Sequence, residues 1–170
     1  MSNVVFPPLI RYKGALASKA TVFLAGTIDM GDSLDWQEKA STVIGPIAEI
    51  IYNPRRPAWD SSWEQTIDSE AFNNQAHWEL DMIERADFVL VNYLPGSQSP
   101  VTMAEFGLCC ALKPRQTIVC CPKGFWRKGN IDIMGERYGI PVYEDLDRAL
   151  VDLNRRLELA SLAGRLVPHG

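Results

Sequence analysis

The chain has 170 residues, of which 46% are hydrophobic and 22% are charged, and its formal net charge is -4. This length allows one domain of ordinary size that buries its core without metals or disulfides, and the composition excludes a disordered or collagen-like chain. The acidic balance argues against nucleic-acid polymers and anionic membranes as main partners, because neither attracts a negative surface. A small anionic ligand in a local basic pocket stays possible.

The N-terminal region does not have the form of a targeting or membrane segment. No stretch approaches the ~18 consecutive apolar residues of a membrane span. A signal peptide needs an unbroken apolar core, which is interrupted here by Pro7, Pro8, Arg11 and Lys13. We expect residues 1–18 to form a loosely attached extension and residues 19–170 to form the domain.

The four cysteines occur as two adjacent pairs, Cys109-Cys110 and Cys120-Cys121. Neighbouring cysteines suit neither a metal site nor a disulfide framework. We therefore expect buried free thiols, no metal, and a cytoplasmic protein.

Short apolar runs alternate with helical patterns along the chain. The apolar runs predict five buried strands, at residues 21–26, 48–52, 87–93, 117–121 and 140–143. The helical patterns predict helices at residues 36–44, with Asp35 as N-cap, and at 70–85, 102–112 and 145–160. This alternation predicts a single doubly wound α/β domain, Rossmann-like or flavodoxin-like, with a five-stranded parallel sheet.

Ligands of doubly wound folds bind beyond the carboxyl ends of the strands. The residues predicted at those ends are Gly26, Thr27, Asn53, Arg55, Arg56, Asn92 and the loop 122–129. The forked donors of Arg55 and Arg56 suit a phosphate, although a loop arginine can equally be solvated or cap a carbonyl. Asn92 either hydrogen-bonds near the site or only ends its strand.

Glu79 lies in the middle of an apolar helix face. On a helical wheel, Phe72, Ala76, Ile83 and Ala86 fall within ~40° of one direction, and Glu79 lies among them. A carboxylate in such a place is costly unless it has a partner or a chemical role. The alternative is that the apolar face ends at a cleft, where Glu79 reaches solvent.

Glu105 is a second carboxylate, close to the start of the helix that follows a Pro/Gly-rich loop. We expect the helix dipole to keep it ionised, so that it can attack an electrophilic carbon. The alternative is a capping box, Thr102-Met-Ala-Glu105, in which Glu105 only ties down the helix start. Taken as a pair, Glu79 and Glu105 suit sugar chemistry with retained configuration, in which one carboxylate attacks and the other handles the proton.

Four tryptophans gather around the predicted cleft: Trp59, Trp63, Trp78 and Trp126. Flat rings suit stacking on a nucleobase, but the same side chains can pack beneath a long loop or at a subunit interface. Trp78 lies off the apolar face of its helix, so something beyond the local core should cover it.

Several segments resemble the nucleoside 2-deoxyribosyltransferase family and the related deoxynucleotide N-hydrolases. They are Val22-Phe-Leu-Ala-Gly-Thr-Ile28, Asn53-Pro-Arg-Arg56, Trp78-Glu79, Arg85-Ala-Asp87 and Ser99-Pro-Val-Thr-Met-Ala-Glu105. The resemblance runs from about residue 21 to residue 143.

The resemblance implies that Glu105 is the nucleophile toward C1′ of a deoxyribose and that Glu79 steers or protonates the departing base. It also implies that Asn130 is similar to an asparagine that reaches a neighbouring subunit, so we expect a homo-oligomer. The residues expected to bind substrate are Gly26, Thr27, Asn53, Arg55, Arg56, Trp78, Asn92, Ser99, Thr102 and Asn130. The implied ligand is a small nucleoside or nucleotide, and no cofactor is expected.

Two departures from the family pattern leave the reaction open. Ser99 stands where the transferases usually have Asp, as in the nucleotide hydrolases, whose Ser contacts phosphate. Glu79 stands where Asp is commoner. We expect a deoxyribosyltransferase, with a 2′-deoxynucleoside 5′-monophosphate N-hydrolase as the alternative. A non-catalytic nucleotide-sensing module is the alternative of another class.

Overall fold

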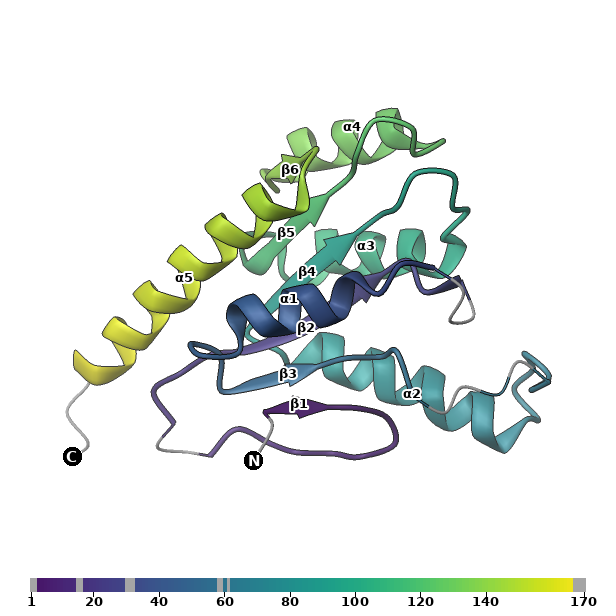
Figure 1. Ribbon diagram of the computed structural model, residues 1–170, viewed down its shortest axis with the longest axis horizontal. Helices are drawn as coiled ribbons and strands as arrows, with labels where there is room; N and C mark the ends of the chain where they lie inside the picture. Colours follow the sequence, from purple (N-terminus) through teal and green to yellow (C-terminus); the bar gives the residue numbers. More distant parts are fainter. Residues whose placement is uncertain (1–2, 15–16, 30–32, 58–59, 61, 167–170) are drawn as a thin grey trace.

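The computed structural model describes the chain except for residues 1–2, 15–16, 30–32, 58–59, 61 and 167–170 (Figure 1). The strands in the described residues are β1 (Val4–Val5), β2 (Thr21–Gly26), β3 (Ile50–Tyr52), β4 (Phe88–Asn92), β5 (Thr117–Cys120) and β6 (Val142–Tyr143). The α-helices are α1 (Trp36–Ile44), α2 (Glu70–Arg85), α3 (Pro100–Leu112), α4 (Lys128–Tyr138) and α5 (Leu146–Leu166), and a short 3-10 helix, η2 (Pro114–Gln116), precedes β5.

The strands form one parallel sheet in the order β1-β3-β2-β4-β5-β6 (Figure 1). The chain runs outward in one direction from β2 to β3 and in the other from β4 to β6. The point where the order reverses therefore lies between β2 and β4, where ligands of such sheets bind. The predicted α/β class and parallel sheet are confirmed.

The predicted number of five strands is wrong, because the sheet has a sixth strand, β1. Val4 lies opposite Ile51 and Val5 opposite Tyr52 at the edge of the sheet. A two-residue strand has no periodic pattern that sequence analysis could detect.

The N-terminal segment also differs from the expected loose extension. Besides β1, the Tyr52 hydroxyl donates a hydrogen bond to the Arg11 carbonyl, and the Trp78 indole N–H donates to the Leu9 carbonyl at 2.7 Å. Both bonds tie this segment to the sheet and to α2. A domain boundary at residue 18 stays a prediction.

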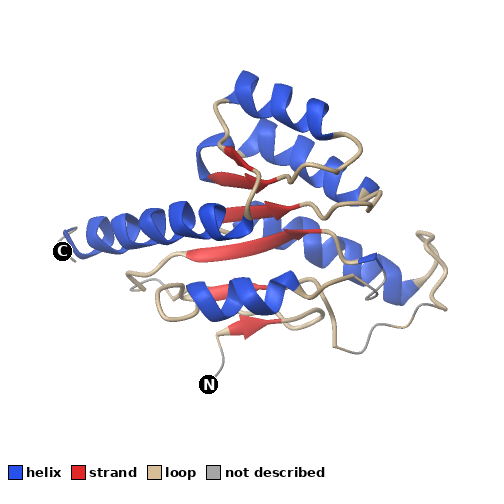
Figure 2. Cartoon of the chain, turned by 45° about the horizontal axis from the view of Figure 1, so that its top comes forward, coloured by secondary structure: helices blue, strands red, loops and turns tan. Residues whose placement is uncertain are grey.

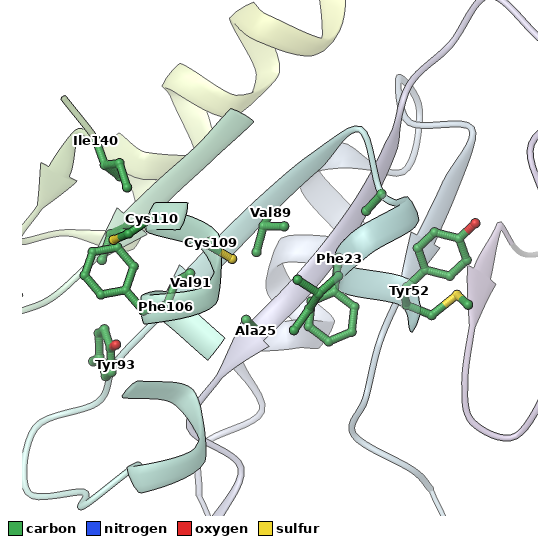
Figure 3. Close-up of a cluster of buried hydrophobic side chains, with 14 of the residues drawn as sticks. Phe23, Ala25, Tyr52, Val89, Val91, Tyr93, Phe106, Cys109, Cys110 and Ile140 are labelled. Atoms are coloured by element: carbon green, nitrogen blue, oxygen red, sulfur yellow. The ribbon is translucent and has the colours of Figure 1, made fainter. Parts of the chain in front are cut away.

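Helices cover both faces of the sheet (Figure 2). On one face, α1 and α5 bury apolar side chains such as Trp36 and Leu153 against Val22, Leu24 and Leu90. On the other, α2, α3 and α4 pack on the alternate residues of the same strands, including Phe23, Ala25, Val89 and Val91 (Figure 3). This alternation follows from the two-residue period of a strand buried on both sides.

All four cysteines are buried and free, as expected. Helix α1 begins as predicted, with the Asp35 side chain accepting a hydrogen bond from the Glu38 N–H at 3.0 Å. Helix α4 was not predicted, because the segment after residue 128 mixes glycine and charged residues without a clear apolar face. No helix in the described part of the chain is both long and apolar enough to cross a bilayer.

Candidate active site

A cavity of about 1130 Å³ opens beyond the carboxyl ends of β2 and β3. Its wall includes nine of the twelve residues that the sequence analysis singles out: Gly26, Thr27, Asn53, Arg55, Arg56, Glu79, Ser99, Thr102 and Glu105. These residues come from the loops after β2 and β3 and from helices α2 and α3. The fold thus brings together side chains that are up to 79 positions apart in the sequence, from Gly26 to Glu105.

Glu79 faces this cavity from α2. Ala76 and Phe72, about one and two turns earlier on the same helix face, also line it, whereas Met82 and Ile83 are buried in the core. The apolar face of α2 therefore continues from the core into the cavity wall, with Glu79 near the transition. Burial raises the pKa of Glu79 to about 7, and a hydrogen bond from Gln75 opposes part of this rise.

Glu105 faces the same cavity from α3 and is only 9% exposed. Burial raises the pKa of Glu105 well above its usual range, and the charge of nearby Glu79 raises it further. The direction of this shift is opposite to the one expected from the helix dipole, which would favour the ionised form of Glu105. The dipole acts mainly within the first turn, and Glu105 lies beyond it.

The capping box is also absent, because α3 begins two residues earlier than predicted. Its first residue is Pro100, and its N-cap is Ser99 in the left-handed conformation, at φ 44°. Proline is favoured at the first helical position, where its missing N–H costs nothing. Glu105 is left without a capping role, and among the described residues no group hydrogen-bonds its carboxyl.

Gly26 ends β2 at the floor of the cavity. Its φ is 156°, and an added Cβ would collide with the Asn92 carbonyl and lie 2.6 Å from the Trp36 ring. The Trp36 indole N–H in turn donates to the Thr27 carbonyl at 2.9 Å. Glycine is needed here because the Asn92 backbone and the Trp36 ring leave no room for a side chain.

Three hydroxyl groups form a closed cluster beside Gly26. The Thr27 oxygen lies 2.6 Å from that of Ser99 and 3.1 Å from that of Ser97, and the two serine oxygens are 2.8 Å apart. Ser97 also donates to the Leu94 carbonyl at 3.0 Å. This cluster connects the loop after β2 to the loop before α3 and fixes the start of α3.

The two adjacent arginines have different surroundings. Arg55 donates to the Ser33 carbonyl at 2.7 Å and lies 3.5 Å from the Asp35 carboxylate, so it holds the loop before α1. Arg56 stacks on the Trp63 ring with its guanidinium carbon 4.9 Å from the ring centroid. Among the described residues, no carboxylate forms an ion pair with Arg56.

Asn53 and Thr102 are buried residues of the cavity wall, 5% and 4% exposed. The Asn53 side-chain oxygen accepts a hydrogen bond from the Arg55 N–H at 2.9 Å, which turns the chain directly after β3. The Thr102 carbonyl accepts a bond from the Tyr93 hydroxyl at 3.4 Å.

Three expected substrate-binding residues do not line the cavity. Trp78 is buried and its ring packs near Phe23 and Tyr52. The N-terminal segment covers it through the hydrogen bond to the Leu9 carbonyl, in line with the expectation that something beyond the local core would do so. Asn92 is 1% exposed and ends β4 beneath Gly26. Asn130 lies on the exposed surface of α4.

Of the other tryptophans expected around the cleft, the two in the described residues do not form the cavity wall. Trp63 lies beneath Arg56, and Trp126 is 51% exposed with Arg127 over its ring. Trp59 lies outside the described residues.

Comparison with known protein families bears directly on this geometry. The family model described as nucleoside 2-deoxyribosyltransferase like matches residues 19–125, more than half of the chain.

The chain belongs to this family.

The match includes both carboxylates and every cavity residue named above, but it ends before Asn130. Membership in the nucleoside 2-deoxyribosyltransferase-like family supports a glycosyl-transferring or glycosyl-hydrolysing function and small nucleoside substrates at the level of the family. A search of curated proteins finds no match to this chain.

The family resemblance does not point to two further polar residues of this site, Gln75 and Ser97. Gln75 lines the cavity and is 4% exposed, and Ser97 completes the hydroxyl cluster. Gln75 precedes Glu79 by four residues, so a helical wheel could have placed it beside that carboxylate. Ser97 gave no such signal, because its loop has no regular period.

Proposed function

We propose that this protein is a nucleoside 2-deoxyribosyltransferase that works through a covalent deoxyribosyl-Glu105 intermediate. The observation that carries the proposal is the pair of buried carboxyl groups, Glu79 from α2 and Glu105 from α3, in the wall of one cavity. Two carboxyl groups are the machinery of sugar transfer with retained configuration.

The reaction follows from one proton shared by this pair. Burial raises both pKa values, so at neutral pH the ligand-free pair retains a proton. With substrate bound, the charged form of Glu105 attacks C1′ and forms an ester bond. The C1′–N bond breaks, its electron pair goes to the base, and Glu79 gives the proton to that base.

The second half of the reaction reverses these steps with another base. A ring nitrogen of the incoming base attacks C1′, the ester bond breaks, and Glu105 leaves as a carboxylate. The proton lost by the incoming base returns to Glu79, so the pair ends as it began. With water in place of the base, the same steps give hydrolysis.

Hydrolysis of 2′-deoxynucleoside 5′-monophosphates is the second candidate, and Arg56 favours it. Its guanidinium lies in the cavity wall, stacked on Trp63 and without an ion-pair partner among the described residues. Such a group suits a phosphate. Ser99 gives less support, because its hydroxyl is held by Thr27 and Ser97 and would have to turn away from them.

One assay separates these activities. The protein is mixed with deoxyinosine and adenine, and the products are followed by chromatography. Deoxyadenosine is expected and identifies a transferase. Free hypoxanthine without deoxyadenosine, or base release only from deoxyinosine 5′-monophosphate, identifies the hydrolase. No reaction with either substrate would overturn both proposals and favour a binding module.

A further inference from the structure

The cavity contains a buried amide, that of Gln75, whose orientation is fixed by two acceptors. Its Nε2 lies 2.7 Å from Glu79 Oε1 and 3.1 Å from the Pro54 carbonyl oxygen. The side chain comes from α2, one turn before Glu79, while Pro54 belongs to the segment that follows β3. Gln75 thus connects that segment to the Glu79 carboxyl.

The Pro54 carbonyl decides which way round the amide lies. A carbonyl can only accept a hydrogen bond, so the amide nitrogen must face it. The same nitrogen has a second N–H, which is directed to Glu79. Turning the amide over would place Gln75 Oε1 against the Pro54 carbonyl and lose that bond. Gln75 Oε1 itself is buried and has no donor among the described residues, so the nitrogen makes both of the bonds that hold this side chain.

This orientation has a consequence for Glu79. An N–H directed at Oε1 is strongest when the carboxyl group is ionised, because a charged acceptor strengthens the bond. When Glu79 holds a proton, that proton belongs on Oε2, since Oε1 is already an acceptor. The bond to Gln75 therefore strengthens as the proton leaves Glu79.

We propose that Gln75 is a positioning residue that holds the Glu79 carboxyl with Oε2 free to carry the proton and stabilises the carboxylate left after proton transfer. This inference rests on the proposed function, in which Glu79 protonates the departing base. It predicts that Gln75 matters only for bases that need a proton in order to leave.

The test uses Gln75→Met, which keeps the length of the side chain and removes both N–H groups. The matched control is Gln37→Met. Gln37 on α1 is another fully buried glutamine, outside the cavity wall, and neither of its amide atoms has a partner among the described residues. Gln75→Leu repeats the test if the Met variant does not fold.

Two measurements are made on each variant. The first is kcat with deoxyinosine and with 7-methyl-deoxyguanosine, whose cationic base leaves without a proton. We expect Gln75→Met to lower kcat for deoxyinosine about tenfold or more and to change kcat for the methylated substrate less than threefold. Equal losses for the two substrates would overturn the proposal, because a merely structural role would slow both.

The second measurement needs no turnover. In protein with ¹³C-labelled glutamate carboxyls, the Glu79 signal is assigned with Glu79→Gln and titrated without ligand. We expect the Glu79 pKa to be about one unit higher in Gln75→Met than in the wild type and in Gln37→Met. The other ionisable groups of the cavity wall, which are the same in both proteins, are Asp29, Asp35, Glu38, Arg55, Arg56 and Glu105.

The two measurements keep the proposals separable. An inactive wild type would overturn the proposed function and with it the role of Gln75 in proton transfer, whereas the titration would still show whether the amide controls the Glu79 proton. An active wild type with an unshifted Glu79 titration in Gln75→Met would overturn the inference about Gln75 alone.

Discussion

Glu79 on α2 and Glu105 on α3 line the same cavity, close enough for the charge of Glu79 to raise the pKa of Glu105. Neither carboxyl has a cation as hydrogen-bond partner among the described residues, and both are buried. Two such groups cannot both ionise at little cost, so burial and mutual repulsion favour a state in which one of them keeps its proton. The predictions about Glu79 and Glu105 follow from this coupling.

Replacing the proposed nucleophile should stop turnover without harming the fold. We expect Glu105→Gln to lower kcat by about 10³-fold or more, because no carboxylate then attacks C1′. Its melting temperature at pH 8 should equal or exceed that of the wild type, since the amide removes a buried ionisable group. Activity within tenfold of the wild type would contradict the assignment.

The covalent intermediate itself should be observable. Wild-type protein quenched during turnover, or treated with a 2′-fluorinated deoxynucleoside that slows release of the sugar, should gain the mass of one sugar. Peptide mapping should place this mass on Glu105. A sugar found on Glu79 would exchange the roles of the two carboxyls, and no adduct under either condition would refute double displacement.

The stability of the protein should fall as the pH rises from about 4.5 to about 7. Burial raises the Glu79 pKa from 4.5 to about 7 on folding, so the folded chain binds more protons than the unfolded chain in this range. The raised pKa does not lower the free energy of unfolding below pH 4.5, and it lowers this free energy by its full amount above pH 7. We expect the free energy of unfolding of Glu79→Gln to be on the order of 3 kcal/mol higher than that of the wild type at pH 8 and to match it near pH 4. Urea unfolding at both pH values measures this, and an equal difference at the two pH values would speak against a raised Glu79 pKa.

Arg56 should distinguish nucleotides from nucleosides. Arg56→Gln should raise KM for a deoxynucleoside 5′-monophosphate about tenfold or more and leave KM for the nucleoside nearly unchanged. Arg127→Gln is the matched control, because Arg127 also stacks on a tryptophan ring, that of Trp126, but lies outside the cavity wall. The phosphate role is wrong if both variants change the two KM values alike.

Gly26 should be essential for stability. Gly26→Ala should lower the free energy of unfolding by about 2–4 kcal/mol, because the new Cβ would meet the Asn92 carbonyl and the Trp36 ring. Gly107→Ala is the matched control, since a Cβ on Gly107 in α3 meets nothing within 4 Å, and it should stabilise the helix by about 0.5–1 kcal/mol. Thermal unfolding of the two variants measures the contrast, and a stable Gly26→Ala protein would show that the strand ends can move apart.

The parts of the fold that could be predicted are those with a clear period. Helix α1 and helix α2 begin and end at the predicted residues, because each has an apolar pattern along its length. Strand β1 and helix α4 could not be predicted, since one is too short to have a period and the other has a weak apolar face. The start of α3 was misplaced because Pro100 was assigned to the loop, although proline suits the first turn.

The site shows a similar division. The positions of Glu79 and Glu105 relative to the sheet follow from the order of strands and helices. Sequence analysis could therefore predict that both lie near the carboxyl ends of the strands. The ionisation of Glu105 could not be predicted, because it depends on how deeply α3 is packed and on a charge from α2. The sequence left open whether Trp78 packs or stacks on a base for a related reason, because the carbonyl that receives its N–H lies 69 residues away at Leu9.

The short edge strand β1 changes how the beginning of the chain should be treated in the laboratory. Its neighbours Asn3 and Phe6 line the cavity, and the Asn3 carbonyl and the Val5 carbonyl accept hydrogen bonds from Ile51 and Asn53. Trimming the first six residues, as one would remove a disordered tail, would leave β3 with a bare edge just before Asn53 and take away part of the cavity wall. An affinity tag is therefore better fused at the other terminus.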